Sequence, residues 1–481
     1  MSFALRAQVV AALPTLLVAQ QAKPPAPRAI AAAEAKAGEI LSAVSQARGL
    51  PDGRVLVNDA IGRRVLLFEK DLKTFTVVAD TTPATGNAYS GRFAGLIPYR
   101  GDSTLFVDPQ ALTMMVIDPA GKLGRVMSVP RPNEAQALVA GNNGFPGFDS
   151  QGRLVYRAPP QLRMAGGPGA PGGPGGGGQR MEIRSDGGGA RGPGGMPAGF
   201  RMPDFPDSNA VVRVEMATRK LDTLGFVKVP KTKLEMTTDT SGRMMVAPII
   251  NPLPQVDDWA VLSDGSVALI RGIDYHIDWT KADGAKESSE RLPFEWRHLN
   301  DSAKAAFVDS AQVAMNKMRE NAQRQMQENP GQMPRMMQEG AAMIGAPMIS
   351  FRMEGGPPGG ARGGDGARPR NESGPAGGMN FQMPPLKMVA PNELPDYAPP
   401  FNTGAARADM DGNLWVRTSI LVNGGPIYDV IDRSGKLVDR VSLPAGRVIA
   451  GFGKGGIVYM GVREETGVRL EQARRSPTTL P

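Results

Sequence analysis

One pattern of apolar and polar positions recurs along most of the chain. A short apolar strand leads into a tight turn of Asp, Gly or Ser, and a second, alternating strand follows and ends in a polar residue. Asp-Gly turns supply the positive φ that a short hairpin needs. Two more apolar strands follow most copies, so each unit predicts four antiparallel strands. The clear copies begin at Gly49, Tyr99, Phe148, Val261 and Ala408, and a weaker one begins at Gly451.

Four-stranded antiparallel units in series are typical of β-propeller blades. The pattern predicts six blades between residues 39 and 475, and the last copy supplies only three strands. The residues just before Ile40 are expected to add the fourth strand and close the ring. Residues 232–256 do not fit the count and form either a long connection or a partial seventh blade. The predicted fold class is all-β, a six-bladed β-propeller.

The repeats resemble a known group of propellers. Phrases such as DDWAVLSDGSVALIRG are similar to those of six-bladed propellers of the broad NHL/TolB-like type, especially the exported bacterial ones. The resemblance covers most of residues 40–444 outside two inserts. Because its motifs are structural, it implies the fold and no particular activity.

Two inserts interrupt the repeats. Residues 160–206 are rich in Gly and Pro and cannot bury enough apolar area to offset the entropy of ordering. Within residues 297–394, the segment 300–329 places apolar residues at three- and four-residue steps, which predicts a helix with one apolar face. The rest of this insert is rich in Gly, Pro and Met. Packing and partner docking both explain a Met-bearing face.

The N-terminus carries a short apolar segment. Residues 7–19 follow one positive charge and are too few to span a bilayer, which takes about 20 residues. This pattern predicts a signal peptide over residues 1–19, then a linker with a possible closing strand over residues 20–38. The mature chain is expected to be periplasmic or secreted, without a transmembrane segment.

The composition excludes several kinds of site and partner. The chain has no Cys and only two histidines, His276 and His298, which excludes disulfides, thiolate metal sites and multi-histidine metal sites. The net charge of +8 suits anionic partners in general. No basic stripe accompanies this charge, so nucleic acid is not an expected partner.

Strand direction predicts which polar residues gather at one opening of the propeller. If the Asp-Gly turns lie at the far rim, the ends of the second strands lie at the opposite one, here called the near rim, where both inserts also emerge. The near-rim positions are Asn58, Asp108, Arg157, Arg271 and Arg417. Guanidinium groups fork onto carboxylate or phosphate, so this set is the candidate ligand-binding site. Such arginines also pair with neighbouring carboxylates or extend over a rim for purely structural reasons.

One trio has residue types that bind metals. Asp274, His276 and Asp278 alternate, so they share one face of a strand and are weak metal candidates. The other interpretation is a solvated face opposite a core face of intervening apolar residues. Propellers of the SMP-30 type, which are metal-dependent lactonases, hold a divalent ion with Glu, Asn and Asp, and no matching set is found here.

These observations predict a non-enzymatic exported propeller without a cofactor. It would bind an anionic small molecule, a peptide or an envelope protein at the near rim. One alternative is a metal-assisted hydrolase, lactonase or lyase that uses a divalent cation such as Ca²⁺. Another is a structural platform for protein interactions. The sequence indicates no catalytic residue.

Overall fold

The computed structural model describes residues 23–91, 93–141, 143–160, 205–238, 244–328 and 387–475. The predicted signal peptide, most of the 160–206 insert and the Gly/Pro/Met-rich part of the second insert lie outside these residues.

Six four-stranded antiparallel blades follow one another along the chain, and blades six and one are joined into a single eight-stranded sheet. Blade one contains β3 (Val44–Gly49), β4 (Val55–Asp59), β5 (Arg64–Phe68) and β6 (Phe75–Ala79), and blade two contains β7 (Gly95–Pro98), β8 (Thr104–Asp108), β9 (Thr113–Ile117) and β10 (Leu123–Ser128). Blade three contains β11 (Gly147–Phe148), β12 (Leu154–Arg157), β13 (Ser208–Val214) and β14 (Leu221–Lys228), and blade four contains β17 (Asp258–Val261), β18 (Val267–Arg271), β19 (His276–Thr280) and β20 (Lys286–Ser288). Blade five contains β22 (Phe401–Ala408), β23 (Leu414–Val422), β24 (Gly425–Ile431) and β25 (Leu437–Ser442), and blade six contains β26 (Arg447–Phe452), β27 (Ile457–Arg463), β28 (Val468–Arg474) and β2 (Ala35–Leu41). The predicted fold class is confirmed.

Strands from both ends of the chain complete blade six. β2 pairs antiparallel with β28, and the inner strand β26 pairs in parallel with β3 of blade one. A Cβ on Gly451 would lie 1.7 Å from the carbonyl oxygen of Ala47, so only glycine allows this close approach. A further short strand, β1 (Arg28–Ala29), pairs in parallel with the outer edge of β25. These pairings leave no unpaired strand edge where the two ends of the chain meet, so the ring is closed there.

The hydrophobic core lies between the blades. Each of its clusters combines the apolar faces of neighbouring blades: one and two, two to four, four and five, five and six, and six and one. Trp259 and Trp415 are among the largest fully buried side chains. Because this packing joins consecutive blades, blade four separates blade three from blade five.

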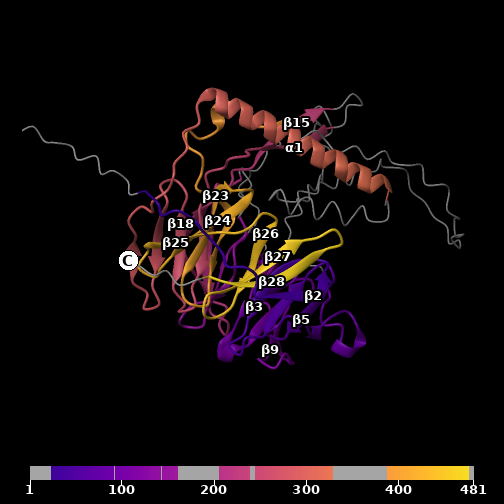
Figure 1. Ribbon diagram of the computed structural model, residues 1–481. Helices are drawn as coiled ribbons and strands as arrows, with labels where there is room; N and C mark the ends of the chain where they lie inside the picture. The colour runs from indigo at the N-terminus through magenta and orange to yellow at the C-terminus, as the bar shows by residue number, and fades with distance from the viewer. Residues whose placement is uncertain are drawn as a thin grey trace, which may run out of the picture.

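The near rim carries the remaining elements. β15 (Lys233–Thr238), β16 (Met244–Ile250) and β21 (Lys387–Met388) form a separate three-stranded sheet, so residues 232–256 are not a seventh blade. In Figure 1, β15 and the helix α1 (Asp301–Glu328) lie on the same side of the propeller. The side chain of Asn300 begins α1 by accepting a hydrogen bond from the Ala303 N–H.

Short 3₁₀ segments occupy the connections η1 (Pro83–Thr85), η2 (Arg100–Asp102), η3 (Pro132–Leu138) and η5 (Pro391–Glu393). Among the described residues, α1 is the one long helix, and it lacks the apolar stretch needed to cross a membrane.

Candidate functional site

The predicted near-rim residues all lie at or near the ends of second strands, but in different environments. Arg157 and Arg271 are the last residues of β12 and β18, and Asp108 is the last residue of β8. Asn58 precedes the last residue of β4, and Arg417 lies within the longer β23. Their burial and partners separate structural members of the set from possible ligand contacts.

Asn58 and Asp108 belong to the interior of the blades. Asn58 is fully buried, donates to the Ala94 carbonyl oxygen and accepts a hydrogen bond from the Tyr89 hydroxyl. Asp108 is also fully buried and accepts hydrogen bonds from the backbone and hydroxyl of Ser90. Both side chains are satisfied by the fold, so we remove them from the candidate ligand set.

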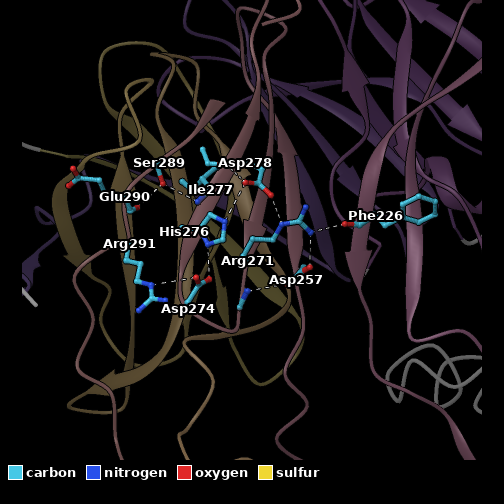
Figure 2. Close-up of polar contacts among 12 residues, drawn as sticks. Phe226, Asp257, Arg271, Asp274, His276, Ile277, Asp278, Ser289, Glu290 and Arg291 are labelled. Atoms are coloured by element: carbon cyan, nitrogen blue, oxygen red, sulfur yellow. Dashed lines mark hydrogen bonds and ion pairs between the residues drawn. The ribbon is translucent and has the colours of Figure 1, made fainter. Parts of the chain in front are cut away.

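Arg271 is held by two carboxylates. Its Nε lies 2.7 Å from Asp278 Oδ2 and its Nη1 lies 2.9 Å from Asp257 Oδ2. The same Nη1 donates to the carbonyl oxygen of Phe226 on blade three, as Figure 2 shows. Although desolvation lowers the pKa of Arg271, hydrogen bonds to Asp278 and Asp257 raise it above its usual value. An arginine neutralised in this way joins two blades and has little charge left for a ligand.

The trio proposed as a metal site forms a chain of close polar contacts. His276 Nδ1 lies 2.6 Å from Asp274 Oδ1, and His276 Nε2 lies 3.3 Å from Asp278 Oδ1. The two carboxylates thus contact opposite nitrogens of one ring, and Asp278 is shared with Arg271 (Figure 2). A metal needs ligands that converge on one point, which this arrangement does not provide. No group of three potential ligands that could hold a metal is found among the described residues.

The sequence predicts correctly which residues of β19 face the core, but it does not predict where this strand begins. Tyr275, Ile277 and Trp279 point into the core, as the sequence indicates. However, β19 begins at His276, and Asp274 lies in the preceding turn, where Tyr275 has a φ of 54°.

Arg157 and Asp258 lie together at the inner edge of the near rim. Arg157 is only 6% exposed, and its Nη2 donates to Asn143 Oδ1 at 2.7 Å. Burial lowers the pKa of Arg157, and the nearby charge of Asp258 opposes this. Burial also raises the pKa of Asp258 to about 6, although it accepts a hydrogen bond from the Ala406 N–H and lies near Arg157. Arg157 therefore helps to fix the loop that enters blade three.

A further arginine, Arg407, lies on the first strand of blade five. It belongs to β22 of blade five, yet its guanidinium carbon lies 4.2 Å from the centre of the Phe145 ring at the entrance to blade three. Blades three and five are not neighbours, so this contact joins two blades that blade four separates. The Phe145 loop is itself anchored, because the Trp259 Nε1–H donates to the Asn143 carbonyl oxygen.

The charge of Arg407 has no described counterion. Burial lowers its pKa to about 10; Tyr428 opposes this effect, and the like charge of Arg417 adds to it. Among the residues with described positions, none forms an ion pair or hydrogen bond with Arg407, although its side chain is only partly buried. Arg417 is exposed on the adjacent strand of the same blade. The structure thus brings Arg417 together with Arg407, a residue that strand-end counting did not identify.

Comparison with protein-family models finds no match, and comparison with curated proteins finds none. Among solved structures, a gluconolactonase from Xanthomonas campestris aligns at 11% identity over 94% of this chain and 97% of that chain, with a TM-score of 0.35. An inactive virginiamycin B lyase from Staphylococcus aureus with quinupristin aligns at 8% identity over 91% and 97%, with a TM-score of 0.33. A calcium-binding regucalcin from Agrobacterium tumefaciens aligns at 10% identity over 92% and 95%, with a TM-score of 0.31.

Two of these proteins are enzymes by name, a lactonase and a lyase, and the third is a calcium-binding protein. Lactonase and lyase are the enzyme classes of the alternative prediction. At such low identities and TM-scores, no residue role can be carried over from them. The roles of Arg407 and its neighbours therefore rest on this chain's own contacts.

Proposed function

We propose that the chain binds an anionic small molecule at the near-rim mouth of its central channel. Arg407 would form the principal charge contact and Arg417 a second one. Arg157 would act indirectly, by holding the loop against which Arg407 stacks. This proposal keeps the predicted ligand class and rim but moves the site from the strand ends to the axis.

The observation that carries the proposal is the Arg407 guanidinium, which is partly buried and has no described counterion. Desolvation of a charge is costly unless a partner compensates for it. Stacking on Phe145 supplies only part of that compensation, because a cation–π contact contributes about 0.5–2 kcal/mol. A bound carboxylate or phosphate would supply the rest through two parallel charge-assisted hydrogen bonds.

The test is calorimetric titration of the purified protein with phosphate, pyrophosphate, citrate and gluconate at low ionic strength. We expect at least one of these probes to bind at a single site. Arg407→Gln should weaken that binding by at least about tenfold, because a hydrogen bond to a charged group contributes roughly 1.5–3 kcal/mol. The melting temperature of this variant should not fall, since the substitution breaks no described ion pair.

Arg54→Gln is the matched control. Arg54 pairs with Asp52 in the first turn of blade one, at the far rim, so its loss should leave anion affinity unchanged. Failure of all four probes to bind wild-type protein, or equal affinity in wild type and Arg407→Gln, would refute the proposal.

The second candidate is the metal-assisted hydrolase or lyase. The solved structures include a lactonase and a lyase by name, but their sequence identities and TM-scores are too low to support this candidate. It ranks second because the charges of Arg407 and Arg417 raise the electrostatic cost of holding a dication in the same channel. Lactone hydrolysis measured with and without added Ca²⁺ or Zn²⁺ tests it. Metal-dependent turnover would place this candidate first, and no turnover with either ion would remove it.

A further inference from the structure

A second cleft, separate from the channel, opens between blade four and the base of the second insert. The chain leaves the propeller through residues 296–299 and returns through residues 392–398. The two segments are joined by the Leu299 N–H to Asp396 carbonyl bond of 2.7 Å and by a bridge between His298 and Tyr397. Together with the β18–β19 turn, they line an open groove with a volume of about 970 Å³. This volume lies at the upper end of the range of small-molecule sites, about 300–1,000 Å³.

Aromatic rings form one wall of this cleft. Trp296 and Tyr397 both line it, with ring centres 6.5 Å apart and planes at 89°. Tyr397 also packs edge-on against His298, and Trp296 packs edge-on against Phe294. Tyr397 nevertheless remains 47% exposed. Neighbouring rings therefore hold an accessible aromatic surface in place before any ligand arrives.

Polar side chains line the rest of the cleft. Gln255 and Asn392 each offer both hydrogen-bond donors and acceptors. Asp274 offers carboxylate oxygens, and Arg291 lies across from it (Figure 2). Sites of this kind use a few polar groups to orient a ligand that rests on apolar surface.

The charges at the cleft are already compensated. Asp274 contacts His276 Nδ1 at 2.6 Å and Arg291 Nε at 3.5 Å. Asp396 contacts the Nζ of Lys304, a buried lysine of α1, at 2.6 Å. A charged ligand would have to compete with these pairs. A neutral ligand rich in hydroxyl groups would use the remaining acceptor and donor positions without displacing them.

We propose that this cleft binds a neutral carbohydrate. The ring of Tyr397 would cover the apolar C–H face of a sugar ring and the perpendicular ring of Trp296 would contact its edge, while Asp274, Gln255 and Asn392 would bond to its hydroxyls. The site is distinct from the anion site in the channel, since it is built from the outer part of blade four and the insert. Carbohydrate binding here therefore does not depend on Arg407.

The experiment is calorimetric titration of the full chain with cellotetraose, maltotetraose, chitotetraose and laminaritetraose. At least one of these should bind in the millimolar range or tighter, and Trp296→Ala should weaken it by about tenfold or more. Phe226→Ala is the matched control, because Phe226 is an exposed aromatic residue on β14. Circular dichroism checks folding, and Tyr397→Ala, which removes the more exposed ring, is the second variant.

Binding that survives in Arg407→Gln but is lost in Trp296→Ala or Tyr397→Ala supports the cleft and separates it from the channel. The proposal is overturned if no tetrasaccharide binds, or if both aromatic variants bind as wild type does. Binding of tetramethylammonium, but of no sugar, would also overturn it and identify the rings as a cation site.

Discussion

Blade five contains two arginines in opposite electrostatic situations. Arg440, on the outer strand β25, is 1% exposed and its Nε lies 3.0 Å from Asp429 Oδ1. The hydroxyl of Tyr275 donates to the other oxygen of Asp429 at 2.9 Å, which links blade four to blade five. Arg407, on the inner strand β22, stacks on Phe145 and has no described carboxylate partner.

This difference separates a structural charge from a candidate functional one. A buried guanidinium that is paired with a buried carboxylate contributes to folding specificity, and its removal leaves that carboxylate without compensation. A guanidinium that is desolvated but lacks a partner costs stability, and such groups are retained where a ligand supplies the missing charge. Blade five thus contains both the candidate functional arginine, Arg407, and a structural arginine, Arg440, with which it can be compared.

The largest effect is expected from Arg440→Leu. Asp429 would remain fully buried without its cation, and breaking a buried pair costs about 3–5 kcal/mol. Urea unfolding at pH 7 measures the loss. The double variant Arg440→Leu, Asp429→Asn should recover much of it, and Arg213→Leu, which breaks an exposed pair with Asp222, should cost less than about 1 kcal/mol. A single Arg440 variant as stable as wild type would contradict the comparison.

The raised pKa of Asp258 predicts how the stability of the fold depends on pH. Burial raises its pKa to about 6 in the folded chain, above its ordinary value of 3.8, so the folded state binds the proton more tightly between these pH values. The stability contributed by the protonated form is present below pH 3.8 and lost as pH rises through 6.

Asp258→Asn keeps this position neutral. The free energy of unfolding of wild type, minus that of the variant, should therefore fall between pH 4 and pH 7 by up to about 3 kcal/mol. Denaturant unfolding across this range measures the difference, with Asp52→Asn in an exposed turn as the control. A difference that stays flat or rises with pH would show that Asp258 is not protonated near pH 5.

The smallest effect is expected from Arg417→Gln. Arg417 is exposed, so its attraction for an anion is screened by water and salt. Anion affinity should fall by only about threefold at low salt, and the difference should vanish near 0.2 M salt. Calorimetry at both salt concentrations checks this. A loss as large as that of Arg407→Gln would mean that the exposed arginine, and not the channel arginine, is the main contact.

The fold could be predicted because each blade repeats a local signal. The Asp-Gly turns and alternating strands encode antiparallel pairing between neighbouring residues. The parallel contacts of β1 with β25 and of β26 with β3 were not predicted, since they join residues hundreds of positions apart through two-residue ladders without periodicity. For a similar reason the sequence does not decide between a long connection and a partial seventh blade for residues 232–256, because their sheet is completed by β21 from across the second insert.

The candidate site was predicted only in part. Strand direction identifies the rim, but it does not predict depth of burial or partners, which is why Asn58 and Arg271 entered the set. Arg407 is missed because the counting considers only the ends of second strands, and Arg407 lies on β22, the first strand of its blade. Its stacking on Phe145 also depends on how blades three and five face each other across the axis.

The most direct test of an anion site at Arg407 is a crystal of the protein soaked in selenate, examined by anomalous scattering. The account predicts a selenium peak within hydrogen-bond distance of the Arg407 guanidinium and none beside Arg440. A channel without a peak at Arg407, in a crystal where selenate occupies other sites, would contradict it.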